Sequence, residues 1–242
     1  RAKAQYAQSL VALRPTLHNE PMLDWRQARH PILYLKFRQQ DKTLVPLSLR
    51  LKENRMLIIS GPNAGGKSVC LKTVALLQYM LQCGLLVPLD EGSEMGIFRN
   101  ILVDIGDEQS IEDDLSTYSG HLRNMKDFLR QADARTLLLI DEFGSGTEPL
   151  IGGAIAEAIL TQLVSQGAFG VITTHYTNLK HFAEQTPAVV NGAMLYDRGQ
   201  MRPLFQLSVG QAGSSFAVEI ARNIGLPEAI IAHATDLVGE EH

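Results

Sequence analysis

The chain has 242 residues, of which 45% are hydrophobic and 20% are charged, and its formal net charge at pH 7 is -4. Such a chain is long enough to bury a sizeable core, as one large domain or two small ones, and its composition is that of an ordinary globular protein. The negative charge argues against a broad nucleic-acid-binding face in this segment, although a local basic patch is compatible with it. No apolar run approaches the length of about 18 residues that a membrane span needs, and the start has no signal-peptide pattern.

The two cysteines, Cys70 and Cys83, show no metal-ligand spacing. We therefore expect buried, reduced thiols in a cytosolic protein. The chain opens on Arg1 rather than Met, so we expect it to be part of a longer protein.

The elements predicted in the first quarter of the chain follow from hydrophobic periodicity. Tyr6, Leu10 and Leu13 at helical spacing predict a helix over about residues 1–13. Prolines at 15, 21 and 31 then indicate an irregular stretch, and two apolar runs on either side of a polar turn predict strands over 32–37 and 44–51.

Three later runs are short and nearly all apolar, as is typical of strands buried on both faces: 55–60, 136–143 and 169–175. Between the last two, residues 151–167 have helical spacing and end at a glycine, a common helix stop. Apolar strands alternating with helices predict an α/β fold with a mostly parallel sheet covered on both sides. The tail, residues 214–242, predicts two short helices broken at 225–227.

A glycine-rich loop joins the strand at 55–60 to the next helix and matches the pattern Gly-x-x-x-x-Gly-Lys-Ser. Glycines let consecutive backbone N–H groups point inward, and the N-terminus of the following helix favours an anion. Lysine at this place can reach the β- and γ-phosphates of a nucleotide, and serine offers a hydroxyl to Mg²⁺. The alternative is an ordinary glycine-rich turn, which would need neither the lysine nor the serine. The loop residues are Gly61, Pro62, Asn63, Ala64, Gly65, Gly66, Lys67 and Ser68.

An acidic pair lies at the end of the strand predicted at 136–143. Asp141 is suited to hold magnesium through its water shell, and Glu142 is placed to polarise an attacking water. On its own such a pair is as often a surface turn, but the glycine loop upstream favours a nucleotide site.

His175 lies just beyond another predicted buried strand. A histidine there is placed to contact the γ-phosphate or to sense its loss. The alternative is a solvent-facing histidine or one with its hydrogen bonds satisfied in the core.

These motifs together resemble the ATPase domain of the MutS family, within the wider ABC-type ATPases. The family's loop reads GPNxxGKS, and Asn63 matches its third position. The resemblance covers essentially the whole chain and is closest to the second bacterial MutS branch, which is linked to recombination control rather than mismatch repair. The segments that carry it are 3–10, 29–33, 105–125, 141–149 and 213–234.

The resemblance implies a P-loop NTPase fold of the ABC/MutS type, with a small antiparallel β part and a C-terminal helical dimerisation element. It implies three parts: residues 1–30 as a helix and connector from a preceding clamp or lever region, 31–210 as the ATPase domain, and 211–242 as the dimerisation element. ATP or ADP with Mg²⁺ would be bound by the glycine loop, Val69 and Asp141, with Lys67, Glu142 and His175 acting in catalysis.

Further site residues follow from the resemblance alone. Ser116 and Thr117 match a signature loop that caps the γ-phosphate held by a partner subunit, although a plain helix N-cap looks the same. Asp107 and Gln109 precede it in a polar loop, and residues 144–149 resemble a loop that contacts the partner. Where relatives stack the adenine on an aromatic ring or a histidine, this chain has aliphatic residues, namely Leu44, Val45 and Leu207.

The resemblance therefore implies an ATP-hydrolysing homodimer in the bacterial cytoplasm, associated with the nucleoid. DNA contact or nicking would lie mainly in domains outside these residues, and no membrane is involved. Two alternatives stay open: a nucleotide-gated dimerisation module with negligible hydrolysis, and another ABC-type ATPase head.

Overall fold

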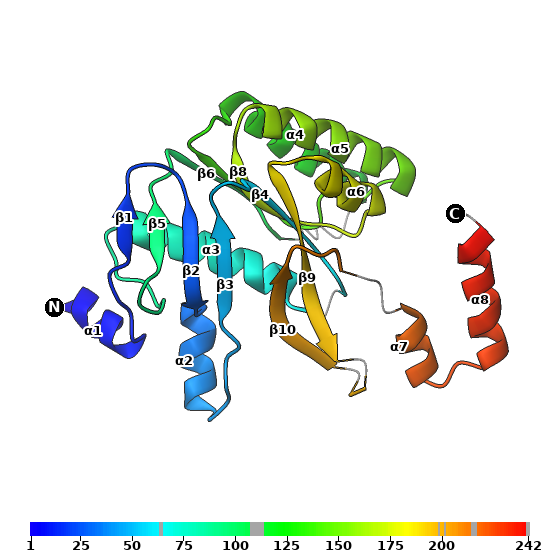
Figure 1. The fold of residues 1–242 in the computed structure, drawn as a ribbon, viewed down its shortest axis with the longest axis horizontal. Coiled ribbons are helices and arrows are strands. Elements are labelled where there is room, and N and C mark those ends of the chain that lie inside the picture. The colour runs from blue at the N-terminus through cyan, green and yellow to red at the C-terminus, as the bar shows by residue number, and fades with distance from the viewer. Residues whose placement is uncertain (63–64, 107–113, 198, 201, 214–216, 241–242) are drawn as a thin grey trace.

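Figure 1 shows the computed structural model of the chain, with two sheets and the helices that pack on them. The structure describes residues 1–62, 65–106, 114–197, 199–200, 202–213 and 217–240. Among the described residues, no helix has the length and the apolar character to span a membrane.

The described residues form a six-stranded sheet in the order β10-β9-β4-β8-β7-β6. All neighbours pair in parallel except β10, which pairs antiparallel with β9 at one edge. The predicted α/β fold with a mostly parallel sheet is therefore confirmed. The strands are β4 (Met56–Ser60), β6 (Asn100–Asp104), β7 (Thr136–Ile140), β8 (Phe169–Thr173), β9 (Val189–Asp197) and β10 (Arg202–Val209).

Two hydrophobic cores lie on opposite faces of this sheet, because successive side chains of a strand alternate between its faces. In β4, Leu57 and Ile59 belong to one core, whereas Met56 and Ile58 belong to the other. The first core is covered by α3 (Lys67–Gln82), and the second by α4 (Asp114–Gln131), α5 (Pro149–Ser165) and α6 (Thr177–Gln185). Every residue of β4, β7 and β8 is buried, which explains their continuous apolar runs.

The smaller sheet of the described residues has four strands in the order β1-β5-β2-β3 and contains the antiparallel part. Its strands are β1 (Thr16–His18), β2 (Leu23–Ala28), β3 (Leu47–Leu51) and β5 (Glu94–Gly96). Trp25 of β2 is buried in the first core, which the two sheets therefore share. This sheet pairs β2 with β3, so it crosses the boundary between the predicted segments 1–30 and 31–210.

The strand predicted at 32–37 is wrong, because these residues lie in the helix α2 (Pro31–Gln39). The helix has two start signals: a proline at its first position and His30 as N-cap, whose side chain accepts a hydrogen bond from the Leu33 N–H. Proline fits the first helical turn because its missing N–H has no partner there anyway. A short apolar run is compatible with either structure, and these start signals distinguish the two.

The helix predicted at 1–13 is shorter than expected. The helix α1 (Ala2–Ser9) ends where Val11 adopts a left-handed backbone with φ of 51°, and Leu13 then forms an isolated bridge with Val87. Leu10 is fully buried in the first core. Packing against that core therefore determines the backbone conformation after the second turn of the helix.

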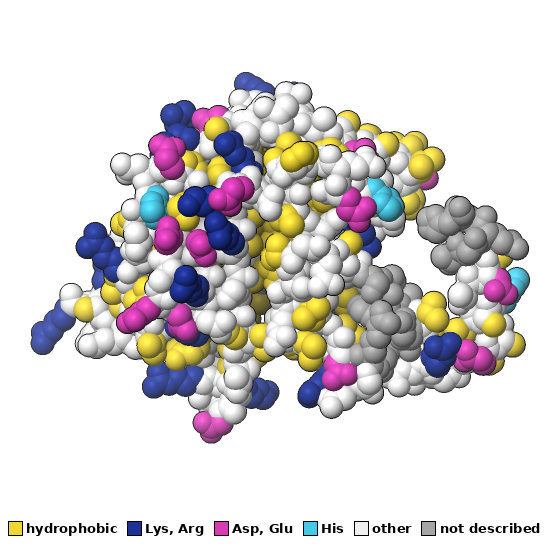
Figure 2. Space-filling view, viewed as in Figure 1, with side chains coloured by type: hydrophobic (Ala, Val, Ile, Leu, Met, Phe, Trp, Pro, Cys, Tyr) yellow, Lys and Arg dark blue, Asp and Glu magenta, His cyan; other side chains and the backbone are white. Residues whose placement is uncertain are grey.

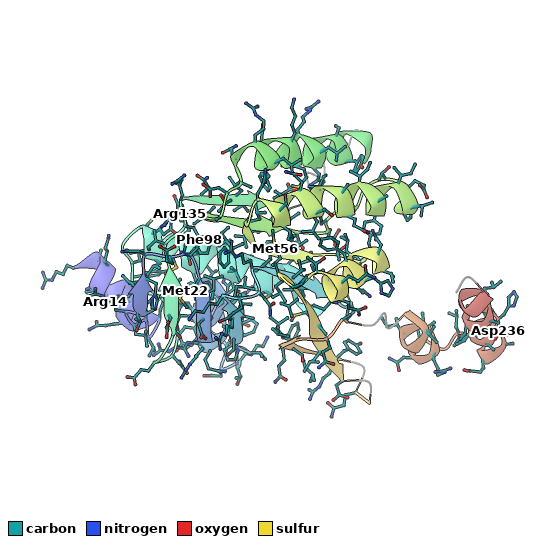
Figure 3. The ribbon with its side chains drawn as sticks, turned by 45° about the horizontal axis from the view of Figure 1, so that its top comes forward. Arg14, Met22, Met56, Phe98, Arg135 and Asp236 are labelled. Atoms are coloured by element: carbon teal, nitrogen blue, oxygen red, sulfur yellow. The ribbon has the colours of Figure 1, made fainter. Side chains whose placement is uncertain are left out.

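The C-terminal segment forms two helices, as predicted, α7 (Ala217–Asn223) and α8 (Glu228–Glu240). Gly225 between them has a φ of 87°, a left-handed conformation that suits a glycine after a helix end. Figures 1 and 3 show both helices standing apart from the two sheets, with Asp236 of α8 at the far side.

Candidate functional site

The glycine loop begins where β4 ends, at the carboxyl edge of the parallel sheet. Gly61 has a φ of 133° and Gly66, the N-cap of α3, has a φ of 94°, so the backbone at both positions is one that side chains rarely allow. A Cβ on Gly65 would meet that of Met194 at 3.1 Å, which leaves little room for a side chain. Asn63 and Ala64 lie outside the described residues. The described part of the loop is thus a tight, partly buried turn at a helix N-terminus, which suits an anion.

Lys67 is the first residue of α3 and is almost completely buried, with 2% of its surface exposed. Its Nζ donates a hydrogen bond to the carbonyl oxygen of Gly61 at 2.8 Å, across the loop. Burial lowers the pKa of Lys67, whereas the nearby carboxylates of Glu142 and Asp141 act to raise it. Ser68, next in the helix, is half-buried beside it. A buried ammonium group at the base of the loop is a fixed positive charge for a phosphate.

The acidic pair lies at the end of β7, two strands away from β4 in the same sheet. Thr173, the last residue of β8 between them, donates a hydrogen bond from its hydroxyl to the Asp141 carboxylate. The same hydroxyl accepts from the backbone N–H of Glu142 at 2.8 Å. Thr173 is fully buried, so it fixes the orientation of Asp141 toward the loop edge.

Glu142 has a left-handed backbone with φ of 48°, which is uncommon for a residue with a long side chain. Its Oε1 lies 4.0 Å from the Nε2 of His175, and both side chains are nearly half exposed, at 43% and 47%. Backbone strain of this kind is often found at functional sites, where surrounding contacts hold it. The two side chains thus face each other across the ends of β7 and β8.

The pKa of His175 is lowered, first by burial and then by the positive charge of Lys67, while Glu142 acts to raise it. The ring is therefore biased toward its neutral form, in which one nitrogen can accept a hydrogen bond. Lys67, Asp141, Glu142 and His175 all interact electrostatically, so the structure brings these four predicted residues together.

An apolar cavity of about 350 Å³ opens beside the glycine loop, and Gly66 and Val69 form part of its wall. Leu44 and Val45 also line it, as expected. The wall includes two aromatic rings, from Phe37 of α2 and Phe205 of β10. Its size and apolar lining with a few polar groups are typical of small-molecule sites.

Of the three residues expected to contact adenine, one differs from its expected position. Leu207 is absent from the described residues that line the cavity and packs against the first core instead. Phe205, two residues earlier, takes its place, and its Cδ1 would meet a Cβ on Gly66 at 3.0 Å. A bulge between Pro203 and Leu207 shifts the register of β10, and Phe205 has a φ of 54° there. The alternation of side chains along the strand therefore fails at this point.

Helix α4 carries the predicted signature residues and is tied to the edge of the large sheet. Asp104, at the end of β6, accepts hydrogen bonds from Asn124 Nδ2 at 2.9 Å and is 2.8 Å from His121 Nδ1. The backbone of Ser116 and Thr117 lies in the first turn of α4, but their side chains lie outside the described residues, as do Asp107 and Gln109.

Two functional candidates other than Phe205 were not predicted. Thr173 holds Asp141, and Lys180 of α6 lies close enough to Lys67 and His175 to lower the pKa of both. Threonine at the end of a buried strand and lysine in an amphipathic helix are common, so no sequence signal marked either.

A magnesium-bound nucleoside triphosphate fits the donor set on three observations. The loop offers backbone N–H groups and a buried ammonium, Asp141 and Ser68 offer oxygen ligands of the kind that Mg²⁺ prefers, and the apolar cavity begins at Gly66. In the described part of the chain there is no cluster of three or more His, Cys, Asp or Glu side chains that could hold a metal unaided. Phosphate and water oxygens would have to complete the coordination.

Comparison with known proteins gives a family and a set of relatives. Residues 57–240 match the family described as MutS domain V. The chain is 46% identical over 98% of its length to a protein named endonuclease MutS2 from Thermomicrobium roseum, of which it covers 31%. It is 44% identical over its whole length to the protein of that name from Pelotomaculum thermopropionicum, and 45% identical over 99% of its length to the one from Geobacillus thermodenitrificans, covering 30% of each. The chain thus spans about a third of the length of these relatives.

Proposed function

The chain belongs to the MutS domain V family, an ATPase family, and from that premise we propose that this chain binds ATP and hydrolyses it to ADP and phosphate at the carboxyl edge of its large sheet. The observation that carries the proposal is the convergence of Lys67, Asp141, Glu142 and His175 beside the glycine loop. These groups come from three adjacent strands, and only the fold brings them together.

Each residue has a separate task in this reaction. The loop N–H groups and the Lys67 ammonium hold the β- and γ-phosphates, which places the γ-phosphorus for in-line attack. Glu142 Oε1 accepts a proton from the attacking water, and His175 Nε2, 4.0 Å away, lies where it can contact the water or the γ-phosphate. Ser68 and Asp141 would hold Mg²⁺, which would supply charge stabilisation for the phosphate oxygens.

The apolar cavity beside Gly66 supports a place for the base. Phe205 and Phe37 offer aromatic faces on which a purine could stack, and Leu44 and Val45 complete the wall. This arrangement supports stacking in place of the purely aliphatic contact that the sequence suggested.

We propose that two copies of the chain complete each other's sites. Ser116 and Thr117 would cap the γ-phosphate of the partner, and residues 211–242 would hold the dimer. The support is a set of exposed apolar residues on α8 and on the turn before it, where Ile224, Ile230 and Leu237 are 70%, 55% and 53% exposed. Apolar patches on small helical elements mark association surfaces more often than free surface.

The activity of the whole protein is a further proposal. Relatives named endonuclease MutS2 are about three times longer than this chain, so DNA binding and any nicking would lie in other segments, with roles in DNA repair and recombination. In that protein residues 1–30 would follow a clamp region, and their strand β2 would belong to the ATPase domain, because it pairs with β3. Figure 2 shows basic and acidic side chains interspersed on the face over the small sheet. This mixture of charges argues against a broad DNA-binding surface on that face.

The test is Glu142→Gln in this chain and in the full-length protein. We expect nucleotide affinity within about twofold of wild type and turnover lowered about 100-fold or more, because general-base catalysis contributes roughly 10²–10⁴-fold. The matched control is Glu157→Gln, a carboxylate on α5 that bonds Asn178, which should leave turnover unchanged. Unchanged turnover in Glu142→Gln would remove the residue from its role.

The second candidate is a nucleotide-gated dimerisation module with negligible hydrolysis. It is favoured by the exposure of Glu142 and His175, since a site open to water in one copy is incomplete. Measuring the specific ATPase rate against protein concentration separates the two. A rate that rises with concentration supports composite sites, whereas no rate at any concentration supports the binding module.

A further inference from the structure

Gly213 lies between the root of the phosphate loop and the C-terminal helices. Its N–H donates a buried hydrogen bond to the Ser60 hydroxyl at 2.7 Å, and its carbonyl oxygen accepts one from Lys180 Nζ at 2.9 Å. Ser60 is the last residue of β4 and is fully buried. One residue is therefore held from both sides, by the strand that precedes the loop and by α6.

The contact at Gly213 leaves no space for a side chain. A Cβ built on Gly213 would lie 2.6 Å from the carbonyl oxygen of Ser60 and 2.9 Å from the backbone nitrogen of Gly61. Both neighbours are backbone atoms, which cannot turn away as a flexible side chain can. The fit thus fixes the path of the chain against the first residue of the loop.

Lys180 links this contact to the charges of the site. It is half-buried, and burial lowers its pKa. Its positive charge lowers the pKa of Lys67 and of His175, so all three cationic or basic groups lie within electrostatic reach of one another. The carboxylates of Asp141 and Glu142 act in the opposite direction, raising the pKa of Lys67 and of His175.

The C-terminal helices begin only a few residues after Gly213. Within the described chain, neither of the two hydrophobic cores includes a residue of α7 or α8. Figure 3 shows α7 and α8 set apart from the two sheets, with Asp236 labelled on α8. In the described chain, α7 and α8 pack chiefly on each other.

We propose that Ser60 and Lys180 clamp Gly213 and thereby couple the occupancy of the phosphate loop to the position of α7 and α8. The proposal rests on the proposed nucleotide site. An anion at Lys67 offsets the repulsion between Lys67 and Lys180, which stabilises the Lys180 ammonium against the Gly213 carbonyl. A phosphate bound in the loop also restricts the backbone of Gly61. Gly213 packs against that backbone, so its position is restricted as well.

Coupling of this kind is reciprocal, since a nucleotide that tightens the clamp must bind more weakly when the clamp is broken. Lys180 is thus a positioning residue that acts on the C-terminal helices through Gly213. A lysine that served the phosphate alone would affect nucleotide affinity without changing those helices.

The experiment measures amide hydrogen exchange over residues 217–240, with and without saturating Mg²⁺ and a non-hydrolysable ATP analogue, at concentrations where sedimentation shows one oligomeric state throughout. In the wild type we expect the analogue to slow exchange about fivefold or more, the lower end of typical coupling. Lys180→Met and Ser60→Ala should abolish the nucleotide-dependent part, and Lys180→Arg should restore it because a guanidinium can still donate to the carbonyl.

Gly213→Ala tests the clamp without changing any charge, and it should also abolish the response. Two matched controls should leave the response intact. Lys3→Met removes a lysine that donates to a backbone carbonyl, of Cys83 at 3.4 Å, far from the loop. Gly199→Ala adds a methyl group where the nearest atom, an Asp197 carboxylate oxygen, is 3.4 Å away.

The outcomes separate this proposal from the nucleotide site itself. If the analogue binds but exchange over 217–240 is the same with and without it, or if Lys180→Met and Gly213→Ala respond as the wild type does, the clamp is overturned and the site stands. If the analogue does not bind to the wild type at any concentration, the proposed function fails first.

Discussion

At the scale of single residues, Glu142 is held in a conformation that its own side chain disfavours. Its φ of 48° costs a residue with a Cβ about 1–2 kcal/mol relative to ordinary backbone. The Thr173 hydroxyl and carbonyl hold it there through the N–H groups of Glu142 and Phe143, at 2.8 and 2.9 Å. The protein thus maintains local strain where the proposed base lies.

Glu142→Gly is expected to raise the free energy of unfolding by about 1 kcal/mol while abolishing turnover, because glycine adopts positive φ without a steric cost. Denaturant unfolding and an ATPase assay measure the two effects. Glu142→Gln is the control, since it removes the same charge and keeps the strain. Equal stabilisation by both variants would show that charge repulsion with Asp141, and not strain, is what glycine relieves.

The pH response of His175 follows from its lowered pKa. A neutral ring is favoured in the folded protein, so this contribution to stability is present above 6.5, the unfolded value, and is lost as the pH falls through that value toward the folded pKa. A histidine NMR titration should therefore give His175 a pKa below 6.5. Lys67→Met should move it upward, because it removes a neighbouring positive charge; a downward or absent shift would contradict the placement of these groups.

At the scale of elements, the bulge in β10 turns the ring of Phe205 into the cavity. The ring is 51% exposed, which leaves a face open for a base. Phe205→Ala is expected to weaken ATP binding by about 1–3 kcal/mol, as base-aromatic stacking does elsewhere. Inorganic tripolyphosphate, which has no base, should bind both proteins equally.

Tyr79→Ala is the matched control for that measurement, because Tyr79 is a 62% exposed aromatic residue in a different cavity. Its affinity for ATP should equal that of the wild type. Equal affinity of Phe205→Ala and the wild type would place the base elsewhere.

The elements that sequence predicts well are those whose signals are local. The glycine loop, the buried strand before it and the acidic strand end each depend on consecutive residues, and the described residues include the strand, the strand end and the two ends of the loop. Thr173 and Phe205 depend on strand register and a bulge, which only the assembled sheet determines. At 32–37 an apolar run favours a strand, whereas His30 and Pro31 are helix start signals. The structure has the helix α2 there.

At the scale of the whole molecule, the large sheet separates two cores and gathers the site at one edge. Side chains of β4, β7 and β8 alternate between the cores, so the strands are rigidly held on both faces. A site built on such strand ends is positioned by packing and has little freedom to rearrange. The C-terminal helices, outside both cores in the described chain, are the part free to respond.

In the proposed function, the loop holds a magnesium nucleotide through Lys67 and the carboxyl edge of the sheet. Titration calorimetry of the chain with ATP and Mg²⁺ tests it most directly, beside Lys67→Met. We expect saturable heat for one nucleotide per chain and a large loss of affinity in the variant. No heat in the wild type, or equal binding by the variant, would contradict it.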